Sequence, residues 1–232
     1  MSRFSIPAWL AAGVLFAALT APSLASPAAK SADNISASRP VAASTDKAMG
    51  APVEPASGDA ITTSIHRIRG FLPDLRFSLT GPNGKTVTQD ELKNKVVLLF
   101  FGYASCPDIC PTTMAQLSMV VESLGKKADD VQIVFISVDP HRDTPEILNA
   151  YVSAFNDHAI GLTGSEKQIA DVARRYRVAY QIEAPTGNDP ENYEVTHARG
   201  IYIFDQKGRA RFLASDSEST ESLAESVREL LG

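Results

Sequence analysis

The pattern of hydrophobic and polar positions predicts strands that alternate with helices over most of the chain. Residues 96–101 form a continuous apolar run, which is typical of a strand buried on both faces of a mostly parallel sheet, and the mainly apolar residues 131–138 predict a second buried strand. Apolar residues also recur at helical spacing in the stretches 111–124, 144–155, 165–176 and 220–231. This alternation indicates an α/β sandwich.

Shorter segments add strands to this picture. Residues 75–79 and 86–88 read as strands on either side of a Gly-Pro-Asn-Gly turn. Residues 200–204 and 209–213 predict a hairpin, and residues 180–182 predict a further strand. We therefore expect a central mixed sheet flanked by helices, with an added N-terminal β-hairpin.

The first 65 residues differ from the rest of the chain. Arg3 precedes an apolar stretch at residues 6–21, and Ser23-Leu24-Ala25 follows as a small-x-small cleavage motif, so residues 1–25 are predicted to be a signal peptide. The alternative is an N-terminal membrane anchor through residues 6–21, although a spanning helix needs roughly 20 apolar residues. Residues 26–65 are rich in Ala, Ser and Pro and predict a flexible linker, which leaves residues 66–232 as the folded domain.

The net charge and the two cysteines limit which classes of function the chain can have. The net charge of -5 argues against a nucleic-acid partner, because phosphate binding needs a basic surface. The chain has two cysteines, Cys106 and Cys110. In an exported protein, two nearby thiols oxidise unless a metal or a reductant holds them reduced.

The two cysteines stand four residues apart, after the first apolar run and where a helical pattern begins. This spacing places both sulfurs on one side of a helical turn, and a helix N-terminus favours the thiolate form. A dithiol loop between a buried strand and a helix is the thioredoxin-like arrangement. Two thiolates are soft ligands that suit Cu(I) best.

Other roles for Cys106 and Cys110 stay open at this point. A disulfide between them would close a short loop and would therefore stabilise the fold little. A Cys₂His₂ zinc site is not excluded by counting, but no two of the four histidines have the usual spacing of zinc ligands. Met114 and Met119 are also soft donors, yet their helical spacing with Leu117 predicts core positions.

A Cys₂His site needs one histidine from elsewhere in the chain. His197 precedes the strand predicted at 200–204, in a polar loop that can aim it at a site. His66 lies at the start of the folded domain, and His141 and His158 follow polar loop residues. A single histidine is more often structural or solvated than a ligand, so the residues alone leave the choice open.

The stretch FGYASCPDICPTT, residues 101–113, resembles the dithiol loop of the Sco/SenC family. The segments TQDEL at 88–92, SVDPHRDTP at 137–145 and VTH at 195–197 extend the resemblance over about residues 66–231. Members of this family are thioredoxin-like, copper-binding proteins that assist assembly of the CuA centre of cytochrome c oxidase. The resemblance implies the same fold for residues 66–232.

The resemblance also implies a ligand set. Cys106 and Cys110 would be thiolate ligands and His197 the imidazole ligand of Cu(I) and Cu(II), with Asp139 near the site, tuning the histidine or thiol exchange. Asp139 has an alternative role in the turn ahead of the next helix. The family commonly has Asp before the ligand histidine, where this chain has Thr196. Another group must then orient His197, or copper affinity is altered.

The function implied by the resemblance is that of a copper metallochaperone in the bacterial periplasm, either soluble or anchored to the inner membrane. Its expected partner is the CuA-bearing subunit of cytochrome c oxidase, together with other copper chaperones or thioredoxin-like reductants. The alternative is an enzyme, a thiol-disulfide oxidoreductase that reduces the target's cysteines through Cys106 and Cys110, with Cys106 as the attacking thiol. The CxxxC spacing differs from the usual CxxC redox motif, which counts against a general oxidoreductase.

Overall fold

The computed structural model describes residues 65–68, 70 and 72–232 of the chain. The predicted signal segment at 1–25 and nearly all of the predicted linker at 26–65 lie outside the described residues. Within the part that is described, none of the helices is both long and apolar enough to cross a membrane.

In the described part of the chain, the central sheet has the strand order β1-β10-β9-β4-β5-β6. The strands are β1 His66–Arg67, β4 Val96–Gly102, β5 Val131–Ser137, β6 Ala159–Leu162, β9 Ile201–Phe204 and β10 Ala210–Ala214. β4 and β6 both run parallel to β5, whereas β9 is antiparallel to β4. Every residue of β4 and β5 is buried, so the predicted mixed sheet with an apolar centre is confirmed.

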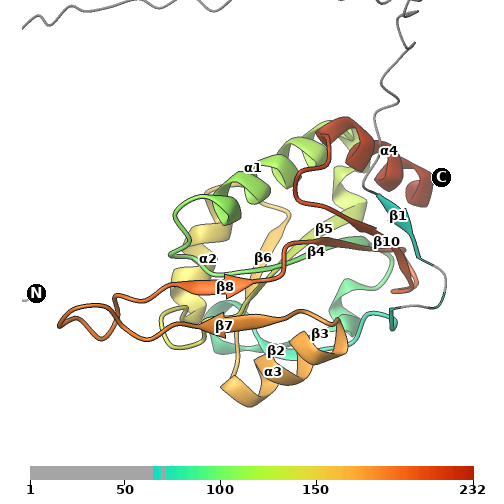
Figure 1. Ribbon diagram of the computed structural model, residues 1–232. Helices are drawn as coiled ribbons and strands as arrows, with labels where there is room; N and C mark the ends of the chain where they lie inside the picture. The colour runs from blue at the N-terminus through green and yellow to red at the C-terminus, as the bar shows by residue number, and fades with distance from the viewer. Residues whose placement is uncertain (1–64, 69, 71) are drawn as a thin grey trace, which may run out of the picture. The chain divides into compact units, whose positions relative to one another are not determined.

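Helices and a small hairpin cover this sheet. The helices are α1 Ile109–Glu122, α2 Pro145–Ser153, α3 Glu166–Arg175 and α4 Thr220–Leu231. Figure 1 shows α1 and α4 together on one side of the sheet and α3 on the other, beside the hairpin of β2 (Ser78–Thr80) and β3 (Thr86–Thr88). The predicted α/β sandwich with an added N-terminal hairpin is therefore confirmed.

Local sequence explains where these helices begin. The Thr144 side chain accepts a hydrogen bond from the backbone N–H of Ile147, and Pro145 occupies the first turn of α2. Ser165 and Gln168 form a reciprocal capping box at the start of α3. These polar side chains satisfy N–H groups that the helices leave unpaired.

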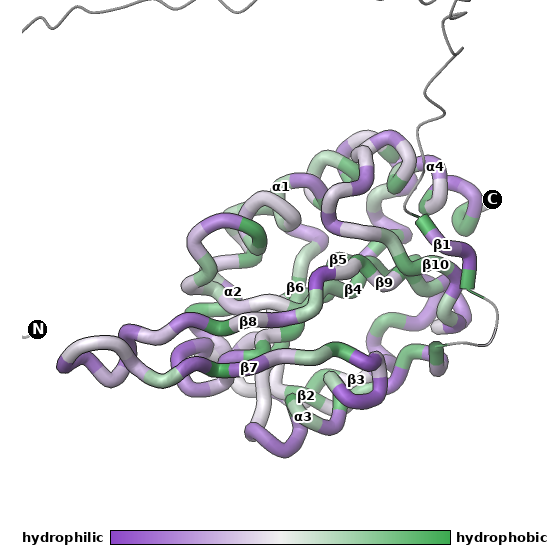
Figure 2. The backbone as a smooth tube through the Cα atoms, viewed as in Figure 1, coloured by the Kyte–Doolittle hydropathy of each residue, from purple (hydrophilic) through white to green (hydrophobic). Residues whose placement is uncertain are grey.

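A second small sheet projects from the body of the molecule. It consists of β7 (Tyr180–Ile182) and β8 (Val195–His197), which pair antiparallel and place Tyr180 opposite His197. Figure 1 shows this hairpin running past one end of the central sheet, and Figure 2 shows hydrophilic residues at its tip and hydrophobic residues along β4 and β5. The hairpin carries the candidate histidine, so its position matters for the site.

Met119, expected in the core, and Ile147, an apolar residue of the stretch 144–155, prove to be exposed. Met119 is 51% exposed and Ile147 is 48% exposed. Met119 follows Met114 by five residues, which turns it about 140° around a helix with 3.6 residues per turn, away from the buried face. Met114 is fully buried, as predicted, and Leu148 and Val152 form the inner face of α2.

Candidate metal centre

The two cysteines lie where β4 passes into α1. β4 ends at Gly102, and α1 begins at Ile109, two residues earlier than the expected start at Pro111. Cys110 therefore lies inside the first helical turn, and its backbone N–H points to the Cys106 sulfur at 3.5 Å. Both cysteines are free thiols.

Their surroundings make the two thiols unequal. Burial opposes ionisation of Cys106, but hydrogen bonds from the backbone N–H groups of Asp108 and Cys110 and from the side chains of Cys110 and Tyr103 outweigh it and lower the Cys106 pKa. Cys110 is fully buried, and burial raises the pKa of its thiol. The partly exposed Cys106 is thus the thiol that favours the thiolate form.

The fold brings His197 to the buried thiol from the end of β8. The Nε2 atom of His197 lies 3.6 Å from the Cys110 sulfur, and its Nδ1 atom lies 3.1 Å from the carbonyl oxygen of Ala198. A carbonyl oxygen only accepts, so Nδ1 carries the ring proton and Nε2 presents its lone pair to the sulfur. Burial lowers the pKa of His197, which favours this neutral form.

Aromatic rings hold the imidazole on two sides. The rings of Phe100 and Tyr103 each lie 6.1 Å from the His197 ring, centroid to centroid, in edge-to-face geometry. The backbone carbonyl of Tyr103 also accepts a hydrogen bond from Cys106 N at 3.2 Å. Tyr103 lies within the motif around the cysteines, but only its place in the fold marks it as a neighbour of His197.

The donors fit a soft metal ion in chemistry and partly in distance. Two ligand atoms with bonds of about 2.0–2.3 Å to one metal stand roughly 3.6–3.8 Å apart, and the Cys110 sulfur and His197 Nε2 have such a separation. Over the described residues, no group of three His, Cys, Asp or Glu side chains is gathered closely enough to form a complete metal site. Completing a Cys106–Cys110–His197 site therefore requires adjustment of these side chains.

The hydrogen bonds of the Asp139 carboxylate are with Arg142 and Tyr193, not with the cysteines or His197. It is fully buried after β5, where it accepts hydrogen bonds from Arg142 Nε at 2.5 Å and from the Tyr193 hydroxyl at 2.7 Å. The carboxylate that acts on Cys110 electrostatically is Asp143, which accepts hydrogen bonds from Ser137 Oγ and Ala104 N. Asp143 lies in the quoted SVDPHRDTP segment, but only its place in the fold marks it out.

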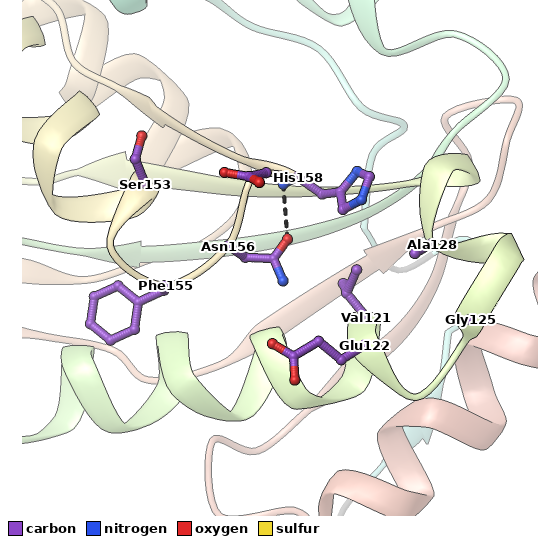
Figure 3. A pocket seen from close by; sticks show the side chains of 9 residues that line it. Val121, Glu122, Gly125, Ala128, Ser153, Phe155, Asn156 and His158 are labelled. Atoms are coloured by element: carbon purple, nitrogen blue, oxygen red, sulfur yellow. Dashed lines mark hydrogen bonds between the residues drawn. The ribbon is translucent and has the colours of Figure 1, made fainter.

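The other histidines lie away from the cysteines. His158 lines a cavity of about 400 Å³ near the C-terminal end of α1, where Glu122 and Asn156 also face the cavity and the backbone N–H of His158 donates to Asn156 Oδ1 (Figure 3). His141 lies 3.2 Å from Glu166, and His66 is a residue of β1. The structure thus brings together the two cysteines and His197.

A buried strand, a dithiol at the start of the following helix and an imidazole against one thiol define a thioredoxin-like dithiol protein. The chain belongs to the SCO1/SenC family, whose model matches residues 72–232. It is 41% identical over 133 residues to a SCO2-like protein of Rickettsia prowazekii, a match that covers 57% of this chain and 64% of that relative. The match thus spans just under two thirds of the relative's length.

Solved structures of the family share the fold. Bradyrhizobium japonicum ScoI with copper bound has 39% identity and a TM-score of 0.61, over 68% of this chain and 98% of that one. Apo Sco1 from Thermus thermophilus has 35% identity and a TM-score of 0.65, over 75% of this chain and 99% of that one. Copper is therefore the metal found in a homologous structure.

Proposed function

We propose that this chain is a copper metallochaperone that binds Cu(I) and Cu(II) through Cys106, Cys110 and His197 and assists assembly of the CuA centre of cytochrome c oxidase. The observation that carries the proposal is the contact of 3.6 Å between His197 Nε2 and the Cys110 sulfur, made by residues 87 positions apart in the sequence. Family membership and the copper-bound relative support copper as the metal.

The chemistry of these donors suits transfer. Two thiolates and one neutral imidazole bind Cu(I) well and leave coordination positions open for an incoming ligand. Cysteines of the CuA-bearing subunit would replace the donors of this chain one at a time. The partly exposed Cys106 would meet the incoming ligand first, because Cys110 is buried.

Thiol-disulfide exchange is a second candidate function, and the inequality of the two thiols favours it. The Cys106 thiolate would attack a disulfide of the target and release one target thiolate, forming a mixed disulfide. Cys110 would then lose its proton, attack the Cys106 sulfur and release the second target thiolate. The target gains two electrons, and this chain is left with a Cys106–Cys110 disulfide.

We also propose where the protein is located and which other proteins it meets. The predicted leader at 1–25 supports export to the bacterial periplasm, with the protein either free or held at the inner membrane through residues 6–21. Other copper chaperones would supply the metal, and thioredoxin-like reductants would keep Cys106 and Cys110 reduced.

Anaerobic Cu(I) titration of the reduced full chain, followed by X-ray absorption, tests the ligand set. We expect one copper with two sulfur ligands and one nitrogen ligand. His197→Ala should remove the nitrogen and weaken binding strongly, and Cys106→Ser or Cys110→Ser should each abolish tight binding.

His158→Ala is the matched control, because it removes a histidine that lies in a separate cavity. Unchanged copper affinity in His197→Ala would contradict the ligand assignment. Exchange with a peptide that carries the oxidised CuA motif separates the two functions, because it needs both cysteines and should persist in His197→Ala.

A further inference from the structure

The strand that carries His197 has few backbone ties to the rest of the fold. In the described part of the chain, β8 pairs only with β7, in a sheet separate from the central one. The further backbone hydrogen bonds that the structure shows for this segment also lie within the hairpin, among them the one from Ala198 N to Ala179 O at its base. Apart from the covalent connections to α3 and β9, side-chain contacts therefore hold the hairpin against the body of the molecule.

Arg142 supplies such contacts. Its Nη1 atom donates to the carbonyl oxygens of Glu191 at 3.0 Å and Tyr193 at 2.9 Å, both on the segment that leads into β8. Its guanidinium carbon lies 3.8 Å from the centroid of the Tyr193 ring. Arg142 itself follows β5 in the body of the molecule, so it joins the hairpin to that body.

Asp139 fixes the orientation of this arginine. Arg142 Nε donates to one carboxylate oxygen of Asp139, and the Tyr193 hydroxyl donates to the other. The side chains of Arg142 and Asp139 are 13% and 0% exposed, so little water competes for these hydrogen bonds. A planar guanidinium satisfies this carboxylate and two carbonyl groups at once, which a lysine ammonium with a different shape does not reproduce.

The same arginine also reaches the dithiol side of the site. Its guanidinium carbon lies 5.6 Å from the centroid of the Tyr103 ring, which packs against His197. The backbone carbonyl of Tyr103 accepts a hydrogen bond from Cys106 N. Arg142 thus touches both segments whose relative placement decides whether His197 and the cysteines can share one metal ion.

We propose that Arg142, oriented by Asp139 and packed on Tyr193, is a positioning residue that holds the β7–β8 hairpin where His197 can reach a copper ion bound by Cys106 and Cys110. The inference rests on the proposed function and assigns a role to residues outside the ligand set. It also gives Asp139 a role through the hairpin.

Arg142→Lys in the full chain tests this role, because it keeps the positive charge and removes the fork of donors. We expect Cu(I) affinity to fall about tenfold to a hundredfold, with X-ray absorption showing two sulfur ligands and loss of the nitrogen. Amide hydrogen exchange should speed up at residues 179–198. Arg174→Lys is the matched control, since Arg174 is an exposed arginine with a salt bridge to Asp171.

A double-mutant cycle separates positioning from general destabilisation. If Arg142 acts through His197, then Arg142→Lys combined with His197→Ala should bind copper no more weakly than His197→Ala alone. Additive losses, or a retained nitrogen ligand with unchanged affinity in Arg142→Lys, would overturn the proposal.

Tyr193→Phe guards against a folding defect in the arginine variant. It removes one hydrogen bond to Asp139 and keeps the ring beneath Arg142. A loss of copper affinity smaller than that of Arg142→Lys, with faster amide exchange in the hairpin, supports the proposal. Unchanged nitrogen coordination or unchanged amide exchange in the hairpin opposes it. If His197→Ala alone leaves affinity unchanged, the proposed function fails. If His197→Ala weakens copper binding but the arginine and tyrosine variants leave copper affinity and nitrogen coordination unchanged, only the positioning role fails.

Discussion

A backbone carbonyl group orients the imidazole ring of His197. Thr196, which stands where the resemblance to the family implies Asp, is exposed and pairs with Gln181 across the hairpin. The carbonyl oxygen of Ala198 accepts a hydrogen bond from Nδ1 at 3.1 Å. The ring is therefore oriented for a metal at Nε2 without a neighbouring carboxylate.

Gly102 offers a test at the scale of a single atom. A methyl group at this position would lie 2.8 Å from the Cys110 sulfur and 2.8 Å from an atom of the Phe135 ring. We expect Gly102→Ala to lower the free energy of unfolding by about 1–3 kcal/mol, because both neighbours are buried and must shift. Copper affinity should fall as well, since one of the shifted atoms is a proposed ligand.

Urea denaturation and Cu(I) titration measure the two effects of Gly102→Ala. Gly200→Ala is the control, because its methyl group would meet Leu213 at 3.3 Å, in a different part of the sheet. An alanine variant with wild-type stability and wild-type copper affinity would show that Cys110 has room to move.

At the scale of elements, the turn between β9 and β10 depends on one carboxylate. Asp205 accepts hydrogen bonds from the backbone N–H groups of Lys207 and Arg209 and from the side chains of Arg209 and Arg211. Burial would raise the pKa of Asp205, but these hydrogen bonds outweigh it and lower the pKa overall. The ionised form of Asp205 therefore stabilises this hairpin.

The sign of the pH dependence follows from that shift. Because the folded-state pKa of Asp205 lies below the ordinary value of about 3.9, the stabilisation is present above that value and is lost as the pH falls through the folded-state pKa. We expect Asp205→Asn to lower the free energy of unfolding by about 1–3 kcal/mol at neutral pH. The difference from wild type should shrink below about pH 4.

Urea denaturation of wild type and Asp205→Asn from pH 7 to pH 3 measures this dependence. Asp90→Asn provides the comparison, since Asp90 is exposed and pairs only with the exposed Lys93 in the contacts that the structure shows. A constant difference between wild type and Asp205→Asn over the whole range would contradict the role of the ionised carboxylate.

At the scale of the whole molecule, copper should stabilise the fold. The proposed ligands come from the start of α1 and the end of β8, 87 residues apart for Cys110 and His197, so a metal that bridges them binds the folded chain far better than the unfolded one. Free Cu(I) at a hundred times its dissociation constant should add about 2.7 kcal/mol to the free energy of unfolding.

Thermal unfolding of the reduced chain with and without buffered Cu(I) measures this gain. Cys110→Ser should lose most of the stabilisation, and His158→Ala should keep it. An equal rise in melting temperature for wild type and Cys110→Ser would place the stabilising copper at another site.

Much of the fold was predictable because its strongest signals are local. The apolar runs at 96–101 and 131–138 became β4 and β5. Thr144 and Ser165, at the starts of the predicted helical stretches, cap α2 and α3 through side chains three residues from the N–H groups they bind. The sequence pattern did not single out Ala159–Leu162 or Val195–His197 as strands. Both are short, and β8 has an exposed middle residue, so their pairing depends on partners distant in the chain.

Some features of the candidate site could likewise be predicted from the sequence, and others depend on the tertiary structure. The sequence by itself determined the dithiol, because the two cysteines, their spacing and the helix that follows all lie within one short stretch. Only the tertiary structure decided that His197 meets Cys110, that Ala198 fixes its tautomer, and that Asp139 binds Arg142 and Tyr193. These contacts join β4–α1, the loop after β5 and the β7–β8 hairpin, and their distances arise when the chain packs around a common core.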